Sequence, residues 1–100
     1  MFKDKKIIAV FGMMKDKDYA YAVKKIAPLC ERIYTTEASN PISLDAKSLA
    51  AEIKPYCKKV KAISSPETAY EKAVKKAKAD DVILVCGSLY LASDIKKIIG

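Results

Sequence analysis

Histidine and tryptophan are absent from this chain of 100 residues, and arginine occurs only at Arg32. The absence of histidine removes the usual general base, the Ser–His and Cys–His nucleophile systems and most zinc sites. The net charge is +7, but the basic side chains are almost all lysines spread over every expected helix. Because base-edge and bidentate phosphate recognition favour arginine, a solvated lysine surface is the favoured interpretation, and we expect no nucleic-acid partner.

Glycine is scarce, with only three residues, and the chain has no phosphate-binding loop of the G-x-x-x-x-G-K-[ST] or G-x-G-x-x-G type. The chain therefore cannot be an ordinary ATPase by itself. No stretch reaches the roughly 18 apolar residues of a membrane span, so we expect no membrane partner. The first lysines are not followed by the long apolar region that a secretory signal needs. Cys30, Cys57 and Cys86 form an odd set without metal-ligand spacing. They predict a reduced, cytoplasmic protein without a metal site of its own.

A regular alternation of apolar runs and amphipathic stretches fills the chain, which we interpret as one domain over residues 1–100. Continuous apolar runs predict strands at 6–11 and 82–86, and the shorter segments RIYTT (32–36) and VKAI (60–63) predict two more strands. Helical spacing predicts a helix from Tyr19 to Pro28, a second over 44–54, a third that starts in the SSPE segment 64–67, and a last one after Gly87.

This order predicts an α/β fold, a Rossmann-like three-layer domain with a mainly parallel sheet of about four strands and helices on both faces. The wholly apolar strands 6–11 and 82–86 are expected at the centre, with a strand order of 3-2-1-4. In such a sheet, ligands bind beyond the carboxyl ends of the strands, where the strand order reverses. The loops GMMKDKD and CGSLY, which follow these two strands, should therefore be neighbours.

Each of these loops has a structural and a functional interpretation. Asp16 and Asp18 with their lysines can orient an amino acid or a hydrated cation, but capping by Asp18 and solvated charge is the more general explanation. Ser88 can place helix N–H groups against an anion, or simply cap the last helix. Cys86 has no histidine to activate it, so a packing role is favoured over a nucleophilic one.

Three segments together resemble the C-terminal domain of folylpolyglutamate synthase, also called dihydrofolate synthase in bifunctional forms, within the Mur ligase superfamily. They are VFGMMKDKDY, TTEASNP before a helix, and DDVILVCGSLYLASDIKK. The resemblance implies an ATP-dependent ligase that activates a folate carboxylate as an acyl phosphate, which the amino group of L-glutamate attacks. It also implies that an N-terminal P-loop domain binds most of the ATP and Mg, while this domain closes over ATP and helps to receive glutamate.

The positions that match the family motifs are cleft candidates for substrate and ATP, and none is expected to be catalytic. They are Gly12, Asp16, Lys17, Asp18, Gly87, Ser88 and Tyr90. Two departures accompany the match. An earlier family strand with an aspartate-glycine-alanine-histidine-asparagine motif has no counterpart, so we expect a truncated or excised domain, inactive alone. The arginine that commonly follows the family's Asn-Pro is replaced here by Ile42 after Pro41.

Two further hypotheses stay open at this point. A stand-alone Rossmann-like module for a small anion or nucleotide is the alternative function, and a lysine-rich nucleic-acid-binding domain is the third. A missing family strand would also leave one sheet edge unpaired, which predicts an edge-strand dimer of the fragment.

Overall fold

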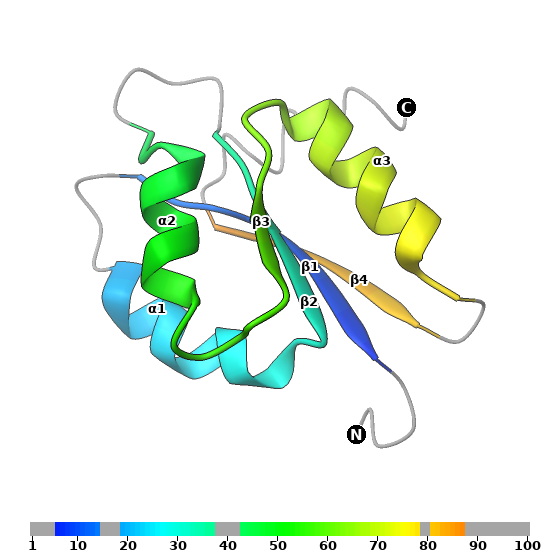
Figure 1. Cartoon of the computed structure of the whole chain (residues 1–100), viewed down its shortest axis with the longest axis horizontal. Coiled ribbons are helices and arrows are strands. Elements are labelled where there is room, and N and C mark those ends of the chain that lie inside the picture. The colour runs from blue at the N-terminus through cyan, green and yellow to red at the C-terminus, as the bar shows by residue number, and fades with distance from the viewer. Residues whose placement is uncertain (1–5, 15–18, 38–42, 79–80, 88–100) are drawn as a thin grey trace.

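The computed structural model describes residues 6–14, 19–37, 43–78 and 81–87 (Figure 1). Its four strands are β1 (Ile7–Gly12), β2 (Arg32–Thr35), β3 (Val60–Ala62) and β4 (Val82–Gly87). All neighbouring pairs are parallel, and the order is β3-β2-β1-β4. The expected strands and their 3-2-1-4 order are therefore confirmed, with shifts of one residue at most strand ends.

The helices alternate with the strands, as the apolar spacing predicts. They are α1 (Tyr19–Ile26), the 3-10 turn η1 (Ala27–Leu29), α2 (Ala46–Ile53) and α3 (Pro66–Lys76). Pro28 lies in the 3-10 turn, because it cannot donate the backbone hydrogen bond that would continue the helix. Ser65 caps α3 by accepting from the backbone N–H of Thr68. The predicted cap Asp18 and the predicted last helix lie outside the described residues.

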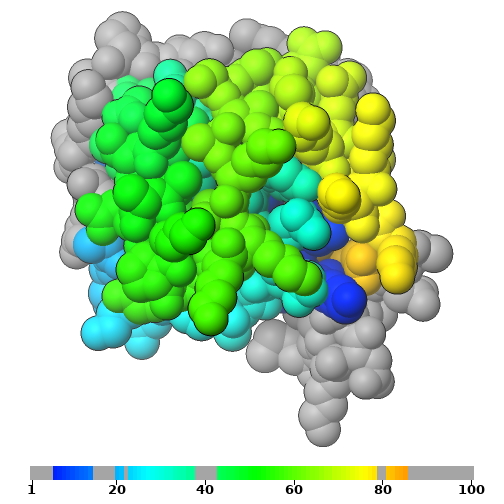
Figure 2. Space-filling view, viewed as in Figure 1, coloured from blue at the N-terminus to red at the C-terminus, as the bar shows by residue number. Residues whose placement is uncertain are grey.

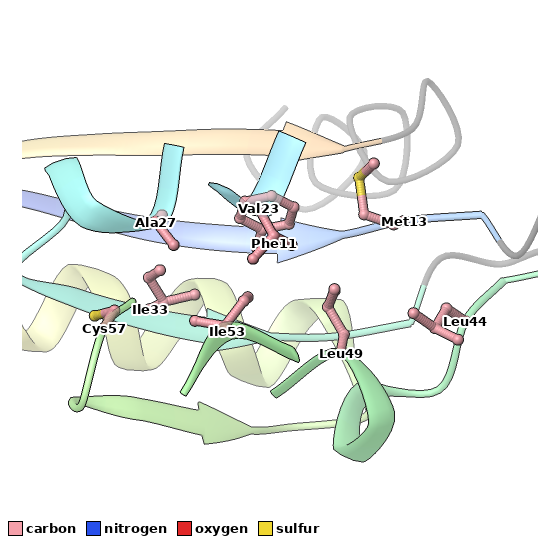
Figure 3. Packing of buried hydrophobic residues seen from close by; sticks show 10 residues of the cluster. Phe11, Met13, Val23, Ala27, Ile33, Leu44, Leu49, Ile53 and Cys57 are labelled. Carbon is pink, nitrogen blue, oxygen red and sulfur yellow. The ribbon is translucent and has the colours of Figure 1, made fainter. Parts of the chain in front are cut away.

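The helices cover both faces of the sheet, which makes the domain three-layered. On one face, α1 and α2 pack over β1 and β2 around Phe11, Ile33 and Leu49, all fully buried (Figure 3). On the other face, α3 places Ala69 and Ala73 against the sheet. The small alanine side chains let the helix approach the strands closely, so both faces of β1 are excluded from water.

One expectation about the centre of the sheet is wrong. Strand 82–86 was expected to be central because it is wholly apolar, but within the described residues β4 pairs only with β1. Leu84 in its middle remains 36% exposed. An apolar run indicates burial on both faces or simply a high strand propensity, and it does not distinguish a central strand from an edge strand.

Candidate functional site

Strands β1 and β4 end side by side at the carboxyl edge of the sheet. The parallel register pairs Gly12 of β1 with Gly87 of β4. Because glycine has no side chain, the chain leaves both strands without steric hindrance between the two exits. The loops that follow therefore start next to each other, as expected. Of the seven cleft candidates, the structure describes these two glycines; the others, Asp16, Lys17, Asp18, Ser88 and Tyr90, lie outside the described residues.

The exit of β1 is held by a segment that arrives from β2. The backbone N–H of Leu44 donates to the carbonyl of Met13 at 2.8 Å, and Met14 forms an antiparallel bridge with Ser43. Both methionine side chains are buried. The chain therefore leaves the sheet in a fixed direction for two residues beyond Gly12, and the first loop begins from a rigid base.

Two threonines at the end of β2 connect this edge to the neighbouring elements. The hydroxyl of Thr35 donates to the carbonyl of Ala46 at 2.7 Å, and the hydroxyl of Thr36 donates to the carbonyl of Ser64 at 3.0 Å. Both threonines are fully buried, and no buried side-chain N or O atom of the described residues lacks a hydrogen-bond partner. The Thr35 hydroxyl thus holds the start of α2 against β2, and the Thr36 hydroxyl holds the turn before α3 there.

Carboxylates occupy the N-terminus of α2. The Glu37 carboxylate accepts from the backbone N–H of Ala46 at 3.1 Å, and the Asp45 carboxylate accepts from the N–H of Ser48 at 3.0 Å. These negative charges satisfy the free N–H groups and the positive end of the helix dipole. The start of α2 is therefore already occupied by carboxylates and offers no free N–H groups of Ala46 and Ser48 to an anion.

Sequence reasoning missed Thr35, Thr36 and Glu37 as residues that shape the site. The available signal was weak: the strand RIYT ends in a threonine that is followed by a second threonine and a glutamate. Their partners lie up to 28 positions away along the chain, a separation that helix and strand periodicities do not reveal.

The described thiols do not supply a nucleophile. Burial, and secondarily the nearby Cys57, raises the pKa of Cys30 to about 11 from its ordinary value of 9.0. Burial also raises the pKa of Cys57, whose thiol lies 3.6 Å from the Cys30 carbonyl oxygen. Both cysteines lie toward the amino end of the sheet, away from Gly12 and Gly87. The side chain of Cys86 lies outside the described residues.

Metal-binding chemistry is not built into the described ranges. No three side chains of the histidine, cysteine, aspartate and glutamate types gather there as ligands. Among the described helices, none is both long enough and apolar enough to cross a membrane.

Comparison with known proteins gives one consistent family. Residues 1–89 match the family model described as Mur ligase, glutamate ligase domain. The dihydrofolate synthase/folylpolyglutamate synthase of Escherichia coli is 28% identical over 97% of this chain and 22% of its own length. A probable bifunctional folylpolyglutamate synthase/dihydropteroate synthase of Halobacterium salinarum is 30% identical over 91% of this chain and 11% of its own length. The chain thus spans about a fifth or less of these relatives.

Solved structures agree with this result. E. coli FolC in complex with DHPP and ADP superposes with a TM-score of 0.88 at 28% identity, over 97% of this chain and 22% of that one. The bifunctional Yersinia pestis enzyme complexed with AMPPNP and Mn ion gives a TM-score of 0.81 at 25% identity, over 96% of this chain and 22% of that one. The first of these two structures thus holds ADP, and the second holds AMPPNP with an Mn ion.

The hydroxyl of Thr35 should contribute measurably to stability. We expect Thr35→Val to lower the free energy of unfolding by about 1–3 kcal/mol, since the Ala46 carbonyl loses its buried donor. Urea unfolding of both proteins measures the difference. Thr68→Val on the exposed side of α3 is the matched control, with an expected change of about 0.5 kcal/mol or less. Equal effects at both positions would contradict the assigned role.

Alkylation of Cys30 should be slow in the folded chain. A thiol with a pKa of about 11 in place of 9.0 carries about 100-fold less thiolate near pH 8. The iodoacetamide rate at Cys30, followed by peptide mapping, should rise with pH toward a midpoint near 11. In urea the midpoint should return to near 9. A midpoint near 9 in the folded chain would show that burial does not protect this thiol.

Proposed function

The chain belongs to the Mur ligase, glutamate ligase domain family, and on that premise we propose that it is the C-terminal domain of an ATP-dependent ligase that adds L-glutamate to folates. The supporting observation is the family match over residues 1–89 on a sheet whose register brings Gly12 and Gly87 together. The names of the relatives support folylpolyglutamate synthase activity, with dihydrofolate synthase activity as a second reaction of the same enzyme.

The proposed reaction forms an amide bond in two steps. The γ-phosphoryl group of ATP is transferred to a folate carboxylate, which gives ADP and an acyl phosphate; the amino group of glutamate then attacks that carbonyl and displaces phosphate. We propose that ATP and Mg are held mainly by an N-terminal P-loop domain, because this sequence has no phosphate-binding loop and its described residues group no metal ligands. The whole enzyme, rather than this domain alone, would then be active.

The role proposed for this domain is to close over ATP and help to receive glutamate. The loop after β1 would contribute Asp16, Lys17 and Asp18 beyond Gly12, with Asp16 binding the ammonium group of the amino acid or ordering the loop. The loop after β4 would contribute Ser88 and Tyr90 beyond Gly87, with Ser88 placing helix N–H groups against an anion. The adjacent strand ends and the fixed exit of β1 support this placement.

Other partners and the location are also proposals. We propose a cytoplasmic location, which the free thiols of Cys30 and Cys57 favour because disulfides are rare in reducing compartments. We also propose that the isolated chain dimerises through the edge of β4. The exposed Leu84 in this edge strand supports that idea, since long apolar edges template pairing between chains.

Glutamate ligation by the full-length enzyme tests the function and the loops together. We expect Asp16→Ala and Ser88→Ala each to lower the rate of glutamate addition about 10- to 100-fold, the cost of losing one charge-assisted hydrogen bond. The control Glu52→Ala removes an exposed carboxylate from α2 and should leave the rate unchanged. The isolated chain should neither hydrolyse ATP nor ligate glutamate.

Thermal melting of each variant separates lost activity from lost folding. If both loop variants melt normally and ligate at the unmodified rate, the loops are ordinary turns. If the unmodified full-length enzyme fails to ligate glutamate to folates, the proposed activity itself is wrong. Tight nucleotide binding by the isolated chain would instead favour the stand-alone module.

Self-association should depend on the edge of β4. We expect sedimentation of the isolated chain to show a dimer that Leu84→Lys converts to a monomer, because a lysine in an edge strand opposes pairing with a second copy. Leu29→Lys, at a position 68% exposed outside the sheet, is the matched control and should leave the dimer intact. A clean monomer of the unmodified chain at high concentration would contradict edge pairing.

A further inference from the structure

A basic groove lies on the α3 face of the sheet, between that helix and β3. Figure 2 shows it as a hollow between the green surface of β3 and the yellow surface of α3, with the cyan surface of β2 beneath. Its volume is about 310 Å³, and none of its lining side chains is acidic. The lining residues are Arg32, Tyr34, Lys61, Lys72, Lys75 and Lys76.

The groove follows from the way the sheet is covered. α3 packs over β1 and β2, which leaves the same face of the edge strand β3 open. Tyr34 of β2 lies in register with Lys61 of β3, so the two side chains project from the same face. Arg32, two residues before Tyr34, projects there as well. The tyrosine is only 2% exposed and forms the floor, while Lys61 is exposed at the rim.

The opposite wall is a lysine-bearing side of α3. Lys72, Lys75 and Lys76 have the i, i+3, i+4 spacing that places side chains on one side of a helix. Ala73 faces the sheet between them. The last turn of α3 adds a partial negative charge of roughly half a unit. That partial charge is small against the five full positive charges around the groove.

The four lysines of the groove form no ion pair among the described residues, while Arg32 also lies near enough to Glu31 to help lower the pKa of that carboxyl. The ion pairs of the described residues join Lys6 and Lys59 to Glu31, whose carboxylate is 3.1 Å from the Lys59 ammonium. Like charges gathered around one hollow repel one another, and a bound anion would remove that repulsion. The groove therefore has the shape and the charge of an anion site, and no acidic side chain belongs to its lining.

We propose that this groove binds a small polyanion, a ligand with several closely spaced carboxylate or phosphate groups. The volume lies at the lower end of the range of roughly 300–1,000 Å³ for small-molecule sites, which argues for a small ligand rather than a long nucleic acid. Four of the five cations are lysines, which act as point charges and do not impose the geometry of a bidentate arginine. α3 returns from the carboxyl edge, so its last turn places this site toward the amino ends of the strands, apart from Gly12 and Gly87.

Calorimetric titration of the chain with two probes tests the proposal. Inorganic tripolyphosphate represents a phosphate-bearing ligand, and tri-γ-glutamate represents a polycarboxylate. Saturable binding of either probe at low salt supports the site. The probe that binds more tightly shows whether the ligand carries phosphate or carboxylate groups. We expect the double variant Lys61→Gln, Lys72→Gln to weaken that binding about tenfold or more. Amide NMR shifts should change around Arg32, Tyr34 and Lys61.

The matched control is Lys47→Gln, Lys54→Gln, which removes the same charge from α2 on the other face and should change the affinity by less than about twofold. Equal weakening by both double variants would show that only net charge matters and would overturn the site. Absence of saturable binding for both probes would overturn it as well. Tighter binding of a single-stranded RNA 12-mer, lost in the groove variant, would assign the groove to nucleic acid instead. None of these outcomes depends on glutamate ligation.

Discussion

The burial of β1 is the constraint on which the rest of the domain depends. Its residues from Ile8 to Phe11 are at most 3% exposed, with β2 and β4 hydrogen-bonded on either side. A strand in this position must satisfy every backbone group through its neighbours, because no water reaches it. The register that results aligns Gly12 with Gly87. The position of the candidate site therefore follows from the hydrogen bonding of the buried β1 backbone to its two neighbours.

Polar contacts then determine how the helices attach to that strand layer. Hydrophobic burial holds α2 against the sheet through Leu49 and Ile53, but apolar contacts are not directional. The hydrogen bonds of Thr35 and Glu37 to Ala46 are directional, and they determine where the first turn of the helix begins. Packing therefore supplies most of the stability, while a few buried hydroxyl and carboxylate groups supply the geometry of the carboxyl edge.

Much of the fold was predictable because it rests on local patterns. Apolar runs and shorter strand-like segments identified all four strands, helical spacing identified three helices, and the rule for doubly wound sheets gave the strand order. The 82–86 strand was misplaced as central because hydrophobicity reports strand propensity and burial but not the number of neighbours. Of the candidate site, sequence reasoning anticipated that the loops after Gly12 and Gly87 would start together. It did not anticipate the Thr36–Ser64 bond or the groove beside Tyr34, since both join residues far apart in the chain.

The anchoring of residues 43–46 also has a consequence for the cooperativity of the domain. This short segment is bonded to β1 through Leu44 and Met13 and to β2 through Ala46 and Thr35, so it cannot detach without breaking contacts of the two innermost strands. Segments held in this way open only when the surrounding core opens, which makes them part of the same folding unit. The carboxyl edge should then respond to a ligand as one rigid body with the sheet.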